Sequence, residues 1–312
     1  MTPTQASFSL IARNRLNIFI FHRVLAVPDS IFPDEPDSAR FNEIMGWVGS
    51  WFNVLPLDTA VDALKSGKLP RRAAAITFDD GYADNHDIAL PILQRHGLTA
   101  TFFIATGFLN GGRMWNDTII ESVRHCKQPE LNLTSLKLGC HAIASSEQKK
   151  RAIEIIISQI KYRSLAKRLE ITEQVAELAK IHPTNNLMMT SQQVQAMRDA
   201  GMQIGAHTVS HPILARTDAY TAREEISSSK TILESLLLEP IRMFAYPNGK
   251  PGSDYFPEHS EIVRELGFSL AVSTAQGAAK QSTDVFQLPR FTPWQKTRTG
   301  FAGQLVKNLL AS

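Results

Sequence analysis

Two aspartates stand side by side in the stretch ITFDDGYADN, residues 76–85, directly after an apolar run and before a glycine. Adjacent carboxylates repel one another, and capping the free N–H groups of a following helix would account for one acid but hardly for both Asp79 and Asp80. A second stretch, QIGAHTVSHP, carries His207 and His211 four positions apart after another apolar run. On a helical turn or in a tight loop, this spacing lets two imidazoles share a cation.

The two stretches together contain the groups that metal-assisted hydrolysis needs. Two histidines and one carboxylate make a three-ligand set that leaves positions for water and substrate. The other carboxylate is then free to take a proton from that water, and the cation offsets the repulsion between the two acids. A histidine pair alone is weak evidence, because most such pairs lie on the surface or in the core, but the paired aspartates strengthen the metal interpretation.

Short apolar runs alternate with helical patterns along most of the chain, and these elements must position the acids and histidines. The expected strands are residues 17–21, 73–78, 99–105, 203–206, 242–246 and 268–273. Expected helices run from Asp58 to Gly67, from the capping-box residue Thr190 to Gly201 and from about Pro257 to Gly267. This alternation predicts a largely parallel sheet with ligands at the carboxyl ends of the strands.

Residues 115–186 break this rhythm and predict a helical insertion within a single domain of residues 1–312. The segment holds a long helical stretch and no clear strand, and Ile153, Ile156, Ile157 and Ile160 share one helical face. We expect this face to pack over the rim of the sheet and the surrounding basic residues to face solvent. Peripheral contact of the insertion with a membrane surface is the alternative.

The composition narrows the function classes. The 312 residues, 43% of them hydrophobic and 20% charged, are typical of a globular chain. A net charge of +3 is too weak to favour a nucleic acid as partner. Cys126 and Cys140 make no disulfide framework. The apolar run 16–21 is shorter than the about 7 to 15 residues of a signal-peptide core, so we expect a cytoplasmic protein.

The motifs TFDDG, residues 77–81, and HTVSH, residues 207–211, resemble the first two motifs of the polysaccharide deacetylase family, the NodB-homology carbohydrate esterases. GFLNGG after the run TATFFIA is similar as well, and the resemblance covers about 18–103 and 187–292. It implies a distorted (β/α) barrel and the metal-dependent removal of an acetyl group from an N-acetylated sugar.

Site roles follow from the motif positions. The resemblance implies that Asp79 is the catalytic base and that Asp80, His207 and His211 bind a divalent metal. Zinc is the first choice for this metal, and Co²⁺, Ni²⁺ and Mn²⁺ are alternatives. The ion would polarise the amide carbonyl and acidify a water, while Asp79 takes the proton of that water.

The third motif departs from the family pattern. Where the family usually has Arg-Pro-Pro-Tyr-Gly, this chain reads FAYPNG at 244–249, so the arginine that orients the base is missing at position 245. Arg290 is the candidate substitute, with Arg242 behind it. The residues expected to bind substrate are Tyr246, Pro247, Asn248, Gly249 and Trp115. Backbone N–H groups around Asn248 are available to an oxyanion. Trp115 fits a core position equally well.

A second departure concerns the general acid, because the C-terminal leucine-x-x-histidine of the family is absent and no histidine follows His259. The first expected strand ends IFIFHRV, which is similar to family branches that deacetylate biofilm-type glucosamine polymers, and His22 is therefore the candidate acid. Asp84, His86 and Asp87 are expected to begin a solvated helix instead of joining the site.

Three functions fit these residues. The leading one is removal of N-acetyl groups from an amino sugar in a polysaccharide, an oligosaccharide or a glycolipid precursor. The expected binding partner is then an acetylated sugar substrate, either free or lipid-linked. Such a substrate would belong to envelope or exopolysaccharide assembly. The first rival is an amidase that acts on a small cyclic ureide or imide. The second is a non-catalytic carbohydrate-binding descendant, which the four intact residues Asp79, Asp80, His207 and His211 argue against.

Overall fold

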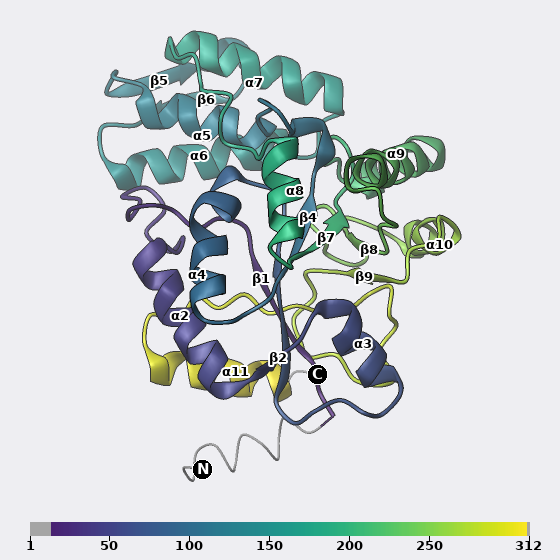
Figure 1. Cartoon of the computed structure of the whole chain (residues 1–312). Helices are drawn as coiled ribbons and strands as arrows, with labels where there is room; N and C mark the ends of the chain where they lie inside the picture. The colour runs from purple at the N-terminus through teal and green to yellow at the C-terminus, as the bar shows by residue number, and fades with distance from the viewer. Residues whose placement is uncertain (1–13, 311–312) are drawn as a thin grey trace.

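A curled, mostly parallel sheet forms the centre of the computed structural model, which describes residues 14–310 (Figure 1). Its strands are β1 (Asn17–Phe21), β2 (Asn53–Val54), β3 (Ala73–Phe78), β4 (Thr101–Ile104), β7 (Gln203–Ala206), β8 (Met243–Ala245) and β9 (Leu270–Val272). The order is β1-β3-β4-β7-β8-β9 with β2 against β3, and every pairing is parallel. The ends of the predicted domain, 1–13 and 311–312, lie outside the described residues.

The segment after β9 joins the two ends of this sheet. Leu288 pairs with Val272 of β9, and Phe291 pairs with Phe19 of β1. The Phe291 N–H donates to the carbonyl of Ile18 at 2.7 Å, and the Phe291 carbonyl accepts from Ile20 at 3.0 Å. Residues 288–291 therefore close the sheet into the distorted (β/α) barrel that the sequence predicts.

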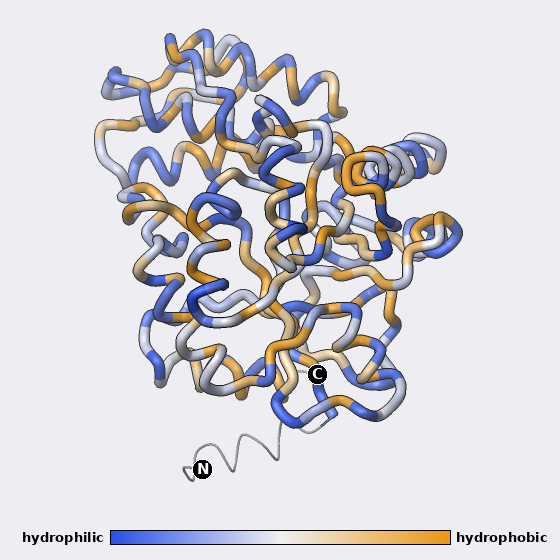
Figure 2. Tube along the Cα trace, viewed as in Figure 1, coloured by the Kyte–Doolittle hydropathy of each residue, from blue (hydrophilic) through white to orange (hydrophobic). Residues whose placement is uncertain are grey.

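The strands are buried on both faces, as parallel strands in barrels are. All residues of β1 and β3 are buried, and Figure 2 shows hydrophobic residues gathered along the central strands. Three expected strands, 17–21, 73–78 and 203–206, have the observed bounds. The others are shorter than expected, because their flanking residues belong to connecting loops.

Helices surround the sheet (Figure 1). They are α2 (Ser38–Trp51), α3 (Leu57–Lys65), α4 (Leu90–Arg95), α5 (Trp115–His125), α6 (Ser146–Ile160), α7 (Leu165–Ala179), α8 (Ser191–Asp199), α9 (Ala219–Leu237), α10 (Pro257–Glu265) and α11 (Arg298–Leu310). Thr190 caps α8 with the predicted capping box. The helix predicted to begin at Asp58 has Pro56 as its N-cap, and the Asp58 carboxylate instead accepts from the adjacent Thr59.

Residues 115–186 gather at the top of Figure 1 around an apolar cluster of their own. The expectation that this segment lacks strands was wrong, because β5 (Glu130–Leu133) and β6 (Gly139–Ala142) form an antiparallel hairpin in which Leu131 and Leu133 point inward. The isoleucine face of α6 is buried, except that Ile157 is partly exposed. It packs in the apolar cluster of the insertion itself and not, as was expected, over the rim of the sheet. Within residues 14–310, no helix has the length and apolar character that crossing a membrane requires.

Candidate active site

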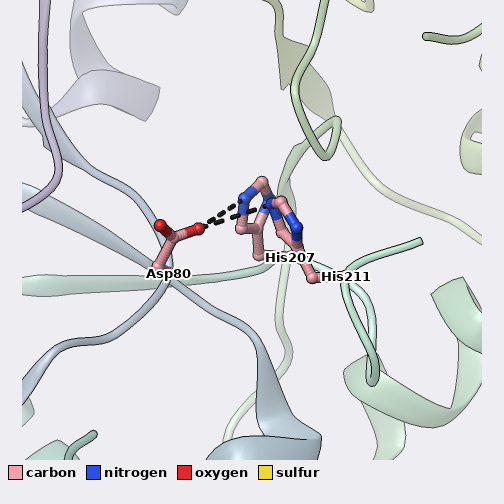
Figure 3. A group of neighbouring side chains, drawn as sticks. All are labelled: Asp80, His207 and His211. Carbon is pink, nitrogen blue, oxygen red and sulfur yellow. Dashed lines mark ion pairs between the residues drawn. The ribbon is translucent and has the colours of Figure 1, made fainter. Parts of the chain in front are cut away.

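Asp80, His207 and His211 converge beyond the carboxyl ends of β3 and β7. Their three potential ligand atoms lie within 4.8 Å of one another. Asp80 Oδ1 is 3.3 Å from His207 Nε2 and 3.4 Å from His211 Nε2, and Figure 3 shows both imidazoles turned toward this oxygen. The oxygen is buried and has no hydrogen-bond partner among the described residues. The convergence that the two motifs predict is therefore present in the structure.

The tautomer of His207 suits a metal ligand. Its Nδ1 lies 2.7 Å from the carbonyl oxygen of Ala245, which can only accept, so Nδ1 carries the hydrogen. In the neutral ring, Nε2 then presents a lone pair toward Asp80, and a lone pair facing a carboxylate oxygen requires a proton or a cation between them. A backbone carbonyl that accepts from the other ring nitrogen is the usual support of a metal-bound histidine.

The charges of this cluster are strongly coupled. Burial would raise the pKa of Asp80, but the two histidines lower it well below its usual value. Burial would lower the pKa of His207, but Asp79 and Asp80 raise it. For His211, burial together with the nearby charge of His207 outweighs the attraction of Asp80 and lowers the pKa to about 3. His211 is consequently a neutral imidazole near pH 7, which is the form that binds a metal.

The HTVSH stretch is a tight loop rather than a helical turn. Thr208 and His211 have φ values of +65° and +52°, a region that non-glycine residues seldom occupy. The Glu225 carboxylate on α9 holds this loop, because it accepts from the Val209 N–H at 2.9 Å and the Ser210 N–H at 2.8 Å. Glu225 was not predicted as a site residue, because an acidic residue in the helix after HTVSH is the one signal that the sequence gives.

Arg290 binds Asp79 with two hydrogen bonds. Arg290 Nη1 donates to Asp79 Oδ1 at 2.7 Å and Nη2 donates to Oδ2 at 2.6 Å, while Nε donates to the carbonyl of Ser273 at 2.8 Å. Both partners are buried. Burial alone would raise the pKa of Asp79, but the charge of Arg290 lowers it, so the carboxylate stays ionised. Of the two candidate arginines, Arg290 is therefore the one that contacts Asp79. Arg242 is exposed and precedes β8, so it lies at the amino end of that strand, away from the site.

A cavity of about 270 Å³ opens onto these groups. Its lining residues are His22, Asp79, Asp80, Met114, Trp115, Asn116, Ile157, Lys161, His207, His211, Asn248 and Thr274. The cavity therefore brings together Asp79, the three potential metal ligands and three further residues that the sequence singles out, His22, Trp115 and Asn248.

The backbone around His22 is held by the same motif that supplies the acids. Asn85 Nδ2 donates to the His22 carbonyl at 2.9 Å. The Asp84 carboxylate accepts from the Val24 N–H at 3.1 Å and from Arg23 Nε at 2.8 Å. Asp84 does begin a helix, as expected, because it is the N-cap of the short helix Asn85–Ala89. Its carboxylate is not fully solvated, however, because its side chain is only 10% exposed and is held by these contacts to the residues that follow His22.

The third-motif loop contributes less than expected. The Tyr246 side chain is fully buried, donates to the Phe286 carbonyl at 3.0 Å and stacks on Tyr255, so it belongs to the core and does not line the cavity. Pro247 is likewise buried away from the cavity lining. The prediction that these two side chains bind substrate was wrong, because Tyr255 and the core take up the space around the tyrosine ring.

Asn248 is the part of this loop that faces the cavity. It has a φ of +58°, and its N–H makes no hydrogen bond with any residue in the described range 14–310. Gly249 supports the turn with a φ of +71°, where a Cβ atom would come within 3.0 Å of Thr274. The Asn248 N–H therefore remains available to an oxyanion, as the sequence analysis expects.

Trp115 combines the two alternatives that the sequence left open. It belongs to the apolar cluster of the insertion and is only 7% exposed. It also lines the cavity. The Arg168 guanidinium lies 4.8 Å from the centroid of its ring. One edge of a largely buried ring therefore faces the site.

Comparisons with known proteins agree with this site. The polysaccharide deacetylase family profile matches residues 66–145 and 167–271, more than half of the chain, and leaves 146–166 unmatched. YxkH of Bacillus subtilis (strain 168), which carries the name of the same family, is 20% identical over 278 residues, which are 88% of this chain and 70% of that protein.

Solved structures show the same fold. The deacetylase PplD of Streptococcus pyogenes, solved in complex with acetate, has a TM-score of 0.62 at 18% identity, with 95% of this chain and 98% of that chain covered. IcaB of Ammonifex degensii has a TM-score of 0.60 at 19% identity over 95% and 97% of the two chains. A de-N-acetylase of Aggregatibacter actinomycetemcomitans gives 0.59 at 18% identity over 95% and 99%.

The extent of the profile match, together with a barrel that brings the TFDDG and HTVSH motifs into one cavity, leads to one assignment. The chain belongs to the polysaccharide deacetylase family, whose members are hydrolases that act on carbon–nitrogen bonds.

Proposed function

We propose that this protein is a metal-dependent deacetylase that removes N-acetyl groups from an amino sugar in a polysaccharide, an oligosaccharide or a glycolipid precursor. One observation carries the proposal. An ionised, arginine-bound Asp79 lies in the same cavity as the Asp80, His207 and His211 cluster. This pairs a base with a three-ligand site, which a purely carbohydrate-binding protein has no need to retain.

The residues present fit a divalent ion. Asp80 would supply a carboxylate oxygen, and His207 and His211 would each supply Nε2, a donor set that suits Zn²⁺ and also accepts Co²⁺, Ni²⁺ or Mn²⁺. When bound, the ion would polarise the amide carbonyl and lower the pKa of a water.

The other residues would divide the remaining steps. Each Asp79 oxygen keeps a lone pair beside its bond to Arg290, so the carboxylate can accept the proton of the attacking water. The free Asn248 N–H would donate to the oxyanion of the tetrahedral intermediate. His22, which is exposed at the cavity, would give a proton to the leaving amine.

A lipid-linked substrate is one form of this proposal. Tyr162 is exposed at the turn between α6 and α7, next to the cavity residue Lys161, and Leu165 and Leu169 are exposed at the start of α7. Exposed apolar side chains beside basic ones support contact with a membrane surface.

The test is a screen for acetate release by the metal-loaded protein. We expect acetate from N-acetylglucosamine oligomers or related acetylated glycans, with metal analysis of the purified chain returning about one divalent ion per molecule. Hydrolysis of a cyclic ureide or imide, with no acetate from any glycan, would replace the proposal by the amidase alternative. Binding of glycans with no turnover of either substrate class would indicate a non-catalytic protein.

A further inference from the structure

One wall of the cavity comes from the predicted insertion. Trp115 and Asn116 lie at the start of α5, and Ile157 and Lys161 lie at the end of α6. These four wall residues include no carboxylate, and Lys161 is the one lysine or arginine among the described residues that line the cavity. Ile157 and Lys161 fall in the segment 146–166, which the family profile does not match, so they lie outside the matched family segments.

Lys161 has no partner of opposite charge. It is half-buried and forms no ion pair within residues 14–310. Its Nζ lies 5.5 Å from the ring centroid of Tyr162, and the Arg216 guanidinium lies 5.3 Å from the same ring. The Tyr162 ring and Arg216 are both exposed to solvent, so of these two cations only Lys161 belongs to the cavity.

Arg168 places a second cation behind the same wall. It is only 3% exposed and forms no ion pair in the described part of the chain, and its Nε and Nη2 lack hydrogen-bond partners there. Its Nη1 donates to the Lys161 carbonyl at 3.3 Å, and its guanidinium lies against the Trp115 ring. Burial lowers the pKa of Arg168 to about 10, so it is still a cation near neutral pH.

A buried charge without a partner is costly, so this arrangement calls for an explanation. The other charges of the cavity do not provide the missing anion. Asp79 is engaged by Arg290, and Asp80 faces two histidines that form a cation site. Asp117, in the first turn of α5, accepts from the Tyr82 hydroxyl at 3.2 Å and is itself buried.

From this excess of positive charge we infer an oxyanion subsite on the insertion wall, with Lys161 as its contact residue and Arg168 as the buried charge that supports it. The inference rests on the proposed function and narrows its substrate to an amino sugar that carries, or directly adjoins, a carboxylate or a phosphate. The apolar faces of Trp115 and Ile157 would contact the sugar ring, and the oxyanion would lie against the Lys161 ammonium.

Equilibrium binding to the full-length protein tests the subsite without relying on turnover. The probes are N-acetylglucosamine 1-phosphate, N-acetylmuramic acid as a carboxylate and neutral N-acetylglucosamine, each titrated by calorimetry. We expect at least one anionic probe to bind about tenfold more tightly than the neutral sugar, since the Lys161 ammonium would donate a charge-assisted hydrogen bond to its oxyanion. Lys161→Gln should remove this preference and leave the affinity for neutral sugar within about twofold, whereas Lys161→Arg should retain it.

Matched variants separate a subsite from general electrostatics and from folding. Arg151→Gln removes the same charge from an exposed position on α6 and should leave all affinities unchanged. Arg168→Met should weaken binding of the anionic probe while the thermal stability is kept or raised, because an unpaired buried charge is removed. A structural role for Arg168 predicts the opposite, namely lost stability and unchanged selectivity.

Each outcome decides something. Preference for the phosphate probe alone would identify a phosphate-linked precursor, and preference for the carboxylate alone would identify an acidic glycan. Equal affinity for neutral and anionic probes, or an anionic preference that survives Lys161→Gln, would overturn the subsite. These results are independent of acetate release, so a failed acetate screen with intact anion selectivity would reject the proposed function and not the subsite.

Discussion

Arg290 donates two hydrogen bonds to Asp79 from a position 211 residues further along the chain. It can do so because residues 288–291 bridge β9 and β1, so the segment that closes the barrel also brings Arg290 to Asp79. The bidentate geometry leaves the carboxylate little rotational freedom. Five predictions follow from this contact and its neighbours.

Asp79→Asn should abolish activity and keep the metal. The amide cannot accept the proton of water, so we expect kcat to fall by about 10² to 10⁴ while metal content stays at the wild-type level. His207→Ala should lose both, because it removes a ligand. Acetate release and elemental analysis of the purified variants check this prediction, and unchanged turnover in Asp79→Asn would refute the base assignment.

Arg290→Lys should slow turnover although it keeps the charge. A lysine ammonium cannot form two parallel hydrogen bonds, so the Asp79 carboxylate loses its fixed orientation. Arg290→Ala should in addition destabilise the fold by about 3 to 5 kcal/mol, because it leaves a buried carboxylate unpaired. Arg242→Gln is the control, since Arg242 is exposed away from the site and should alter neither kcat nor the melting temperature.

His22→Ala should reduce kcat by about 10² or more while metal content and folding are preserved. Asp84→Ala should act through the same residue, because it releases the Arg23 and Val24 contacts that hold the His22 backbone. The double variant should then be hardly slower than His22→Ala alone. Full additivity of the two losses would show that Asp84 does not work through His22, and loss of folding in His22→Ala would assign it a structural role.

Glu225→Ala should weaken metal binding by about 10-fold to 100-fold, as removal of outer-shell support generally does. Its carboxylate holds the Val209 and Ser210 N–H groups that shape the loop before His211. The adjacent Glu224 is exposed, so Glu224→Ala is a matched control. Competition with a chelator measures the affinities, and equal values for the two variants would contradict the role of Glu225.

Stability of the metal-free protein should fall with acid partly through Asp79. Its pKa in the folded state is lowered below 3.8, since the charge of Arg290 outweighs the effect of burial. The unfolded chain therefore binds more protons in this range, and the contribution is full above about pH 5 and is lost as the pH falls through the folded-state pKa. Unfolding by urea between pH 3 and pH 7 should show a shallower pH dependence for Asp79→Asn than for wild type. Parallel curves would mean that Asp79 is not coupled to Arg290 in solution.

Local sequence determined the catalytic cluster and much of the sheet. Asp79 and Asp80 follow an apolar strand, and His207 follows another, so their common edge could be predicted from the geometry of parallel strands. The capping box at Thr190 and the buried isoleucines of α6 were predicted for the same reason. The capping box depends on hydrogen bonds, and the isoleucine face on helical periodicity, among residues that are close together in the chain.

Only the tertiary structure decided which distant residues act on these motifs. Arg242 precedes β8 and is exposed, whereas Arg290 lies in the closing segment, which brings it to Asp79. Packing likewise buries Tyr246 against Tyr255 and brings Lys161 to the cavity wall. The physical reason is that the curl of the sheet and the burial of side chains depend on contacts between segments far apart in sequence, which leave no pattern among neighbouring residues.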